Sequence, residues 1–201
     1  MDELVEDVIG IGGRELSVLR PRDSEALLDE EAFERDEYMP YWAELWPSAL
    51  ALARVVGVRA LRGARTLELG CGLGLPSLAA AIAGGRVLAT DWAPEAIAMT
   101  ERNASRNGLT LETLCVSWTA PEPLLARAPW DLVLASDVLY EARNGDALLP
   151  LLPRLGREIW LADPGRPAAG PFLERVAETF VIEFRRAAEI PQGGVYRLQR
   201  R

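Results

Sequence analysis

Residues 68–76 read Glu-Leu-Gly-Cys-Gly-Leu-Gly-Leu-Pro, the most informative segment of the sequence for the architecture of the chain. The segment just before the turn, at 65–69, carries leucines at 67 and 69 and is typical of a strand. The residues after it, at 75–83, have helical spacing, and a proline at 76 suits a first helical turn. Between them, three alternating glycines let the backbone turn sharply and approach a ligand closely. The stretch therefore predicts a strand, a glycine-rich turn and a helix.

Strands and helices alternate outward from this turn. We expect strands at 65–69, 86–90, 111–116, 131–135 and 158–162, and helices at 47–57, 75–83, 94–106, 143–155 and 172–179. Such alternation produces parallel strands joined by right-handed crossovers. Two last strands, at 180–185 and 194–199, have no helix between them, so an antiparallel hairpin should lie at one edge. The sequence predicts an α/β protein: a doubly wound three-layer α/β/α sandwich with a mostly parallel sheet.

The turn also has the features of a nucleoside site. Asp91 ends the next predicted strand, 21 residues after Gly70, where a carboxylate can accept hydrogen bonds from a ribose diol. A nicotinamide dinucleotide site would need a third glycine at the position of Leu75, whereas the glycine here is Gly74. An acidic residue, Glu68, precedes the first glycine by two positions. These features favour an adenosine-type cofactor other than NAD.

The first 40 residues are acidic and less regular than the rest. We expect a boundary near Met39-Pro40, with residues 1–40 as an N-terminal extension and residues 41–201 as the main domain. Residues 5–9 and 15–19 predict two short strands around Gly12-Gly13. Residues 24–37 are polar enough for a surface helix or a mobile lid.

Composition excludes several reaction classes. The 201 residues include 22 basic ones, all arginine, with no lysine and no histidine. This excludes a Ser-His-Asp triad, a histidine metal site, a lysine Schiff base and a Walker-type phosphate lysine. Proton transfer is left to Asp, Glu, Tyr, Cys, water or the substrate itself, and no metal is expected. Codon bias is the plain explanation for the missing lysines.

The net charge of −8 and the scattered arginines argue against a nucleic-acid partner and favour a cationic substrate. No apolar run has the length of a membrane span, and the acidic start is unlike a signal peptide. The cysteines, Cys71 and Cys115, form no CxxC pattern, which favours a reducing, cytoplasmic location. The oligomeric state stays open.

The pattern ExGxGxG at 68–74 resembles the first motif of class I (seven-β-strand) S-adenosylmethionine-dependent methyltransferases, which have a Rossmann-like fold. Three further segments resemble methyltransferase family 16, a group of protein-lysine methyltransferases: PYWAELWP at 40–47, Ser117-Trp118, and DLVLASDVLYE at 131–141. With ADPGR at 162–166, the likeness is greatest to the branch that methylates the β subunit of electron-transfer flavoprotein. The resemblance covers about residues 38–201.

The resemblance implies a role for each motif residue. Asp137 and Tyr140 would face the acceptor nitrogen as catalytic residues. Trp46 and Trp118 would flank the cofactor, Asp91 would bind its ribose, and 70–72 would line its amino-acid end. The full set of implied cofactor-binding residues is Trp46, Glu68, Gly70, Cys71, Gly72, Gly74, Asp91, Trp92, Trp118 and Ser136. Plainer roles stay open: core packing for Trp46, Trp118 and Tyr140, a helix cap for Asp137, and a loop-holding role for Arg166.

The resemblance implies a protein substrate, methylated on a lysine side chain. Alternatives are a small-molecule N-methyltransferase acting on a nicotinamide-like amine or heterocycle, and a cofactor-binding module without catalysis. A nucleobase amino methyltransferase usually has an (N/D)PP(Y/F) turn, and SDVLY stands here instead. Methyl transfer needs neither lysine nor histidine in the enzyme. A lysine methyltransferase without lysine also has no lysine side chain of its own to methylate.

Overall fold

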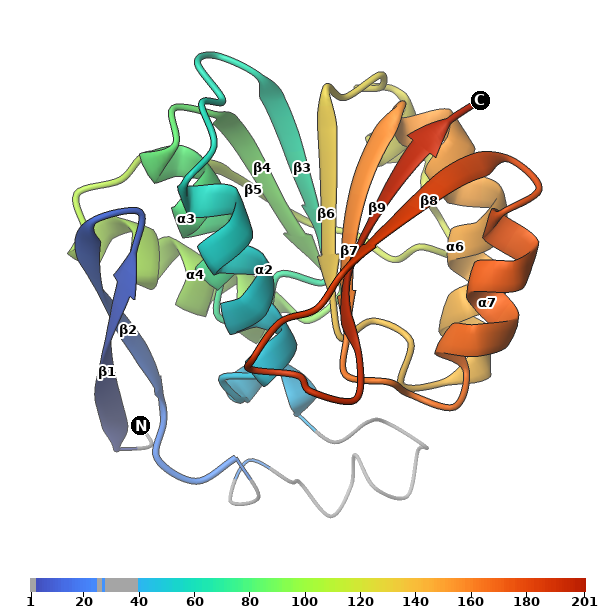
Figure 1. Cartoon of the computed structure of the whole chain (residues 1–201). Helices are drawn as coiled ribbons and strands as arrows, with labels where there is room; N and C mark the ends of the chain where they lie inside the picture. Colours follow the sequence, from blue (N-terminus) through green and yellow to red (C-terminus); the bar gives the residue numbers. More distant parts are fainter. Residues whose placement is uncertain (1–2, 25–26, 28–39) are drawn as a thin grey trace.

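The computed structural model describes residues 3–24, 27 and 40–201, and its centre is a seven-stranded sheet (Figure 1). The strand order is β5-β4-β3-β6-β7-β9-β8. Five strands are parallel: β3 (Arg65–Leu69), β4 (Arg86–Asp91), β5 (Glu112–Cys115), β6 (Leu132–Ser136) and β7 (Glu158–Asp163). The last two, β8 (Phe180–Arg185) and β9 (Gly194–Arg200), pair antiparallel at one edge. The predicted sheet and its terminal hairpin are confirmed.

Helices cover both faces of the sheet (Figure 1). One face carries α2 (Pro47–Gly57), α3 (Leu75–Ile82) and α4 (Pro94–Arg106), and the other carries α5 (Glu122–Leu125), α6 (Ala142–Leu155) and α7 (Ala169–Val176). Alternate residues of β6 supply the two cores: Leu132 and Leu134 pack on the first face, Val133 and Ala135 on the second. A central strand is apolar throughout because both of its faces are buried. The three-layer sandwich is confirmed.

Two helices differ from expectation. α7 spans Ala169–Val176 instead of 172–179. It begins earlier because Pro171 fits a first turn, where its missing N–H costs nothing, and residues 177–179 form a turn before β8. α5 was not predicted, since its four residues are too few to show a period. Pro150 and Pro153 lie inside α6, whose leucines at 148, 151, 152 and 155 are buried against the sheet. Among the described residues, no helix combines the length and apolarity needed to cross a membrane.

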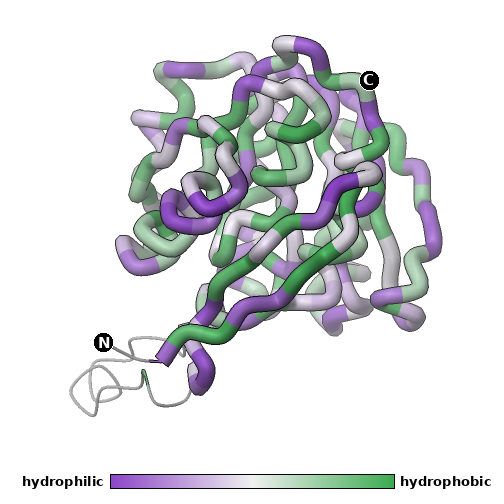
Figure 2. Tube along the Cα trace, turned by 90° about the vertical axis from the view of Figure 1, so that its left-hand side faces the viewer, coloured by the Kyte–Doolittle hydropathy of each residue, from purple (hydrophilic) through white to green (hydrophobic). Residues whose placement is uncertain are grey.

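The predicted N-terminal strands form an antiparallel hairpin of β1 (Leu4–Ile11) and β2 (Arg14–Pro21). Hydrophobic and hydrophilic residues alternate along it (Figure 2), and its apolar side chains at 9, 11, 16 and 18 join the core on the face of α2, α3 and α4, where β1 contacts α2 and β2 contacts α4. Most of the helix or lid expected at 24–37 lies outside the described residues. The boundary at residue 40 stays a prediction.

Two asparagine side chains, one in α4 and one at its C-terminal cap, bind the outer edge of β2. Asn103 Oδ1 accepts the Leu19 N–H at 2.8 Å, and its Nδ2 donates to the carbonyls of Leu19 and Leu73 at 3.1 and 3.0 Å. Asn107 Oδ1 accepts the Ser17 N–H at 2.9 Å, and its Nδ2 donates to the Ser17 carbonyl at 2.7 Å. The two amides act as the missing neighbouring strand. Asn103 also links the hairpin to the glycine-rich turn.

We expect Asn103→Ala to lower the free energy of unfolding by about 2 kcal/mol, because the buried carbonyl of Leu73 and the partly buried backbone groups of Leu19 lose their partners. Urea denaturation measures this. A change below about 0.5 kcal/mol would show that water replaces the amide without cost.

Candidate active site

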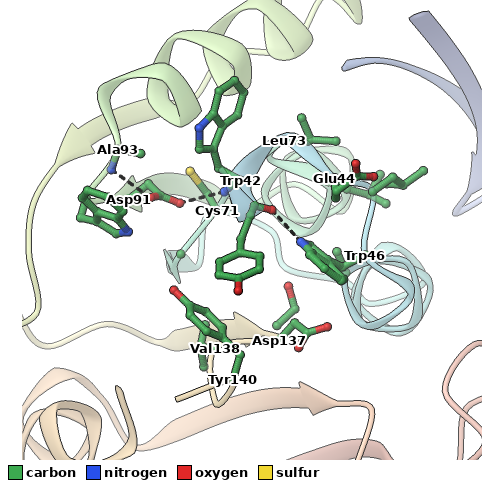
Figure 3. A pocket seen from close by; sticks show the side chains of 18 of the residues that line it. Trp42, Glu44, Trp46, Cys71, Leu73, Asp91, Ala93, Asp137, Val138 and Tyr140 are labelled. Atoms are coloured by element: carbon green, nitrogen blue, oxygen red, sulfur yellow. Dashed lines mark hydrogen bonds between the residues drawn. The ribbon is translucent and has the colours of Figure 1, made fainter. Parts of the chain in front are cut away.

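A cavity of about 210 Å³ lies where β3, β4 and β6 end (Figure 3). The residues that follow these three strands form one wall, and the 3-10 helix η2 (Tyr41–Ala43) with the start of α2 forms another. Ten of the predicted site residues line it: Trp46, Gly70, Cys71, Gly72, Asp91, Trp92, Trp118, Ser136, Asp137 and Tyr140. Segments far apart in the sequence therefore meet at the end of the sheet where ligands bind in doubly wound folds.

The glycine-rich turn packs directly against an aromatic ring. Gly70 has φ +69°, and a Cβ there would lie 3.4 Å from Trp118 Cζ2 and 3.2 Å from Val138 Cγ1. A residue with a side chain would be strained in this conformation, and its Cβ would press on Val138 while touching the Trp118 ring. Cys71 is buried, and burial raises the pKa of its thiol well above the ordinary value. The thiol is therefore neutral and fills space.

Two predicted site residues, Glu68 and Gly74, are absent from the cavity wall. Gly74 caps the N-terminus of α3 with φ +83°, and a Cβ there would lie 2.8 Å from Thr100. Glu68 is fully buried, and its Oε2 accepts hydrogen bonds from the Ser77 N–H at 2.9 Å and the Ser77 hydroxyl. Both residues therefore hold β3, the turn and α3 together from outside the cavity wall.

The buried Glu68 carboxyl should make stability depend on pH. Burial raises its pKa from 4.5 to about 8, so the folded protein keeps a proton that the unfolded chain has lost. The free energy of unfolding should therefore fall as pH rises between these two values. Glu68→Gln removes this titration. Between about pH 5 and pH 6.5, the free energy of unfolding of the variant should rise by about 2 kcal/mol relative to that of wild type. Denaturation at each pH measures both values. A constant difference between the two proteins would show that Glu68 stays ionised.

Asp91 ends β4 with its carboxylate turned toward the glycine-rich turn. Its Oδ2 accepts the Gly72 N–H at 3.0 Å and its Oδ1 accepts the Ala93 N–H at 3.1 Å (Figure 3). Each carboxylate oxygen has a second lone pair, so both can accept a further hydrogen bond. Burial raises the pKa of Asp91, while these backbone donors lower it. The nearby indole of Trp92 is half exposed at the cavity rim.

An aromatic cluster forms the opposite part of the wall. The ring of Tyr41 lies 6.2 Å from that of Trp46 and 5.0 Å from that of Tyr140, and Trp46 Nε1 donates to the Tyr41 carbonyl at 2.7 Å. Sequence reasoning missed Tyr41 as a site residue, although it lies within the PYWAELWP motif. Burial raises the pKa of Tyr140, so its hydroxyl stays protonated at neutral pH.

Asp137 lies beside this cluster, directly after β6. Its φ of +55° is the one positive φ among the described non-glycine residues, and its carboxylate is almost completely buried. Arg166 donates to Oδ1 through Nε at 2.9 Å, and the Ser48 hydroxyl donates to Oδ2 at 3.3 Å. The N-cap residue of α6 is Glu141, whose side chain makes no capping hydrogen bond to the helix. Asp137 therefore does not cap that helix. Sequence reasoning missed Ser48.

In the view of Figure 3, Asp91 and Asp137 lie on opposite sides of the cavity, with Cys71 beside Asp91. The cavity thus offers an acceptor for a diol at one side and a carboxylate among aromatic rings at the other. Among the described residues, no group of three or more His, Cys, Asp or Glu side chains is arranged to hold a metal ion.

In comparisons with known proteins, the chain matches one protein family and is similar to two groups of named methyltransferases. Residues 33–159 match the family described as "Lysine methyltransferase". The chain is 35% identical over 136 residues to "Electron transfer flavoprotein beta subunit lysine methyltransferase" of Xenopus laevis, covering 63% of this chain and 53% of that protein. It is 31% identical over 115 residues to "Histone-arginine methyltransferase METTL23" of Xenopus laevis, covering 54% of this chain and 49% of that protein. The chain therefore spans about half the length of these curated relatives.

A solved structure with the same fold is the 16S rRNA N2 G1207 methyltransferase RsmC of T. thermophilus, in complex with AdoMet and guanosine. Its TM-score is 0.70 at 18% identity, and the alignment covers 98% of this chain and 51% of that one. At this identity the likeness concerns the fold alone.

Proposed function

Because the chain belongs to the lysine methyltransferase family, we propose that it transfers a methyl group from S-adenosylmethionine to a lysine side chain of another protein. The observation that carries the proposal is the single cavity that joins Asp91, through the glycine-rich turn, to Asp137 and Tyr140. The named relatives suggest the electron-transfer flavoprotein β subunit as the acceptor.

The residues present fit this cofactor. The Asp91 oxygens keep lone pairs for a ribose diol, and the Trp118 ring lies against Gly70 at the turn, where both line the cavity. We place the ribose at Asp91, the amino-acid end along 70–72, and the flat faces of Trp46 and Trp118 against the cofactor. When bound, S-adenosylmethionine supplies a methyl group on a positively charged sulfur, which makes it a strong methyl donor.

The other half of the cavity suits a cationic acceptor. Among the described residues, four carboxylates line the cavity as a whole, those of Glu44, Asp91, Asp137 and Glu141, against one arginine, Arg166, and of the four only Asp91 belongs to the cofactor half. This charge attracts a lysine ammonium, and the surrounding aromatic rings exclude water from it. Asp137 accepts a hydrogen bond from the amine and orients its lone pair, while Tyr140 forms the channel wall. The acceptor proton leaves to water, since the Tyr140 hydroxyl is already protonated.

A methyl-transfer assay tests the proposal. The purified protein is incubated with methyl-labelled S-adenosylmethionine and either purified electron-transfer flavoprotein or a cell extract. We expect label in a protein band, and mass spectrometry should place it on lysine. The chain itself has no lysine, so methyllysine in the products comes from the acceptor. Label only in small molecules, or on arginine as the second kind of relative suggests, would contradict lysine as the acceptor. Cofactor binding without any transfer would support an inactive module.

Two finer predictions accompany this function. We place the protein in the reducing cytoplasm, consistent with its two free thiols, the buried Cys71 and the exposed Cys115. We also keep the absence of a nucleic-acid partner as a prediction, on the net charge of −8.

A further inference from the structure

The loop after β7 fixes the backbone of Arg166. The Asp163 carboxylate is fully buried, and its Oδ1 accepts the N–H groups of Gly165 and Arg166, both at 2.7 Å. Gly165 has φ +96°, and a Cβ there would lie 2.8 Å from the Gln192 carbonyl oxygen. The loop is therefore held between a buried carboxylate and the segment before β9. Arg166 starts from a defined position at the cavity wall.

The Arg166 guanidinium makes two contacts inside the cavity. Its Nε and Nη2 atoms both lie 2.9 Å from Asp137 Oδ1, and its Cζ lies 5.7 Å from the centroid of the Trp46 ring. The Asp137 side chain is 5% exposed and that of Arg166 is 34% exposed, so the carboxylate is the buried partner. A buried carboxylate without a paired cation would be costly. Arg166 supplies that cation and limits the directions in which the carboxylate can turn.

Donors surround the Asp137 carboxylate from two elements. Arg166 contacts Oδ1 from the loop after β7, and Ser48 contacts Oδ2 from the first turn of α2. The Asp137 N–H donates to the Ala162 carbonyl at 2.9 Å, which holds the backbone in its left-handed conformation. Catalytic groups fixed in this way lose little order when they meet the substrate.

We propose that Arg166 is a positioning residue for methyl transfer, which holds the Asp137 carboxylate in the orientation that receives the acceptor amine. This inference rests on the proposed function. It gives the DPGR segment a role: Asp163 fixes the loop, Gly165 allows its turn, and Arg166 reaches Asp137. A carboxylate engaged by a guanidinium in this way orients the amine and leaves the acceptor proton to water.

The first test separates positioning from binding. In Arg166→Gln, transfer of labelled methyl groups to the proteins of a cell extract should fall tenfold to a hundredfold in kcat, the loss typical of a charge-assisted hydrogen bond. Affinity for S-adenosylmethionine, measured by titration calorimetry, should stay within about twofold. The matched control is Arg175→Gln, which breaks the exposed Arg175–Asp146 pair outside the cavity and should leave kcat unchanged.

A double-mutant cycle shows whether Arg166 acts through Asp137. In an Asp137→Asn background, Arg166→Gln should change the residual single-turnover rate by less than about twofold. Three outcomes would each overturn the inference. The effects of the two substitutions on the rate could multiply in the double variant, kcat could be unchanged in Arg166→Gln alone, or the affinity of Arg166→Gln for the cofactor could fall tenfold. Crystal structures of wild type and Arg166→Gln give a readout independent of activity: the Asp137 carboxylate should turn away from its wild-type position. If wild type itself transfers no methyl group, the proposed function fails, and the crystal structures still decide the positioning role.

Discussion

Asp137→Asn should reduce kcat for methyl transfer by about a thousandfold while leaving the affinity for S-adenosylmethionine within about twofold. The amide keeps the size of the carboxylate and removes its charge, and that charge is what attracts and orients a lysine amine. The cofactor half of the cavity, around Asp91 and the glycine-rich turn, does not depend on this side chain. Single-turnover methyl transfer and titration calorimetry measure the two quantities separately.

The substitution preserves the backbone at this position. Asp137 has φ +55°, and asparagine adopts the left-handed region more readily than other residues with a side chain, glycine aside. An Asp137→Ala variant would add backbone strain to the loss of charge. The matched control is Asp146→Asn, which removes a carboxylate from an exposed arginine pair and should leave turnover unchanged. Turnover retained in Asp137→Asn would falsify the assignment of Asp137 to the acceptor.

The sheet could be predicted because burial on two faces leaves a direct mark in the sequence. Residues 132–135 are apolar without a break, and the structure buries alternate side chains against opposite helix layers. Helix α5 left no such mark, being one turn long. The bonds from Asn103 and Asn107 to β2 could not be predicted either, because a side-chain amide shows no period and its partners lie more than 80 residues away.

The site could be predicted where it is local in sequence. The glycine-rich turn and Asp91 form one strand–turn–helix–strand unit, so their spacing alone places them together. The contacts of Asp137 with Ser48 and Arg166 join residues 89 and 29 positions apart, and only the folded chain brings them together. Glu68 shows a different limit. Its motif indicates that it belongs to the turn. The identity of its hydrogen-bond partner, Ser77, could not be predicted, because it depends on the direction in which the buried carboxyl points.

Asp91→Ala should weaken binding of S-adenosylhomocysteine, the demethylated cofactor, by about a thousandfold, or roughly 4 kcal/mol. Two charge-assisted hydrogen bonds to a ribose diol, each contributing about 1.5–3 kcal/mol, account for a loss of this size. Titration calorimetry measures the affinity. The matched control is Asp131→Ala, since Asp131 also accepts a backbone N–H, from Arg65 at 2.7 Å, but lies outside the cavity. The control should bind the ligand as tightly as wild type.

Asp91 also supports the turn through Gly72 and Ala93, so a loss of affinity alone does not locate its contact. A ligand cycle does. The 2′,3′-dideoxy analogue of S-adenosylhomocysteine lacks the hydroxyls that Asp91 should bind. Wild type should bind this analogue far more weakly than the parent compound, and Asp91→Ala should bind the two equally. If the variant still distinguishes them as wild type does, Asp91 acts on affinity through the turn, and the ribose lies elsewhere. Equal binding of both ligands by the variant alone places the diol at the carboxylate that ends β4.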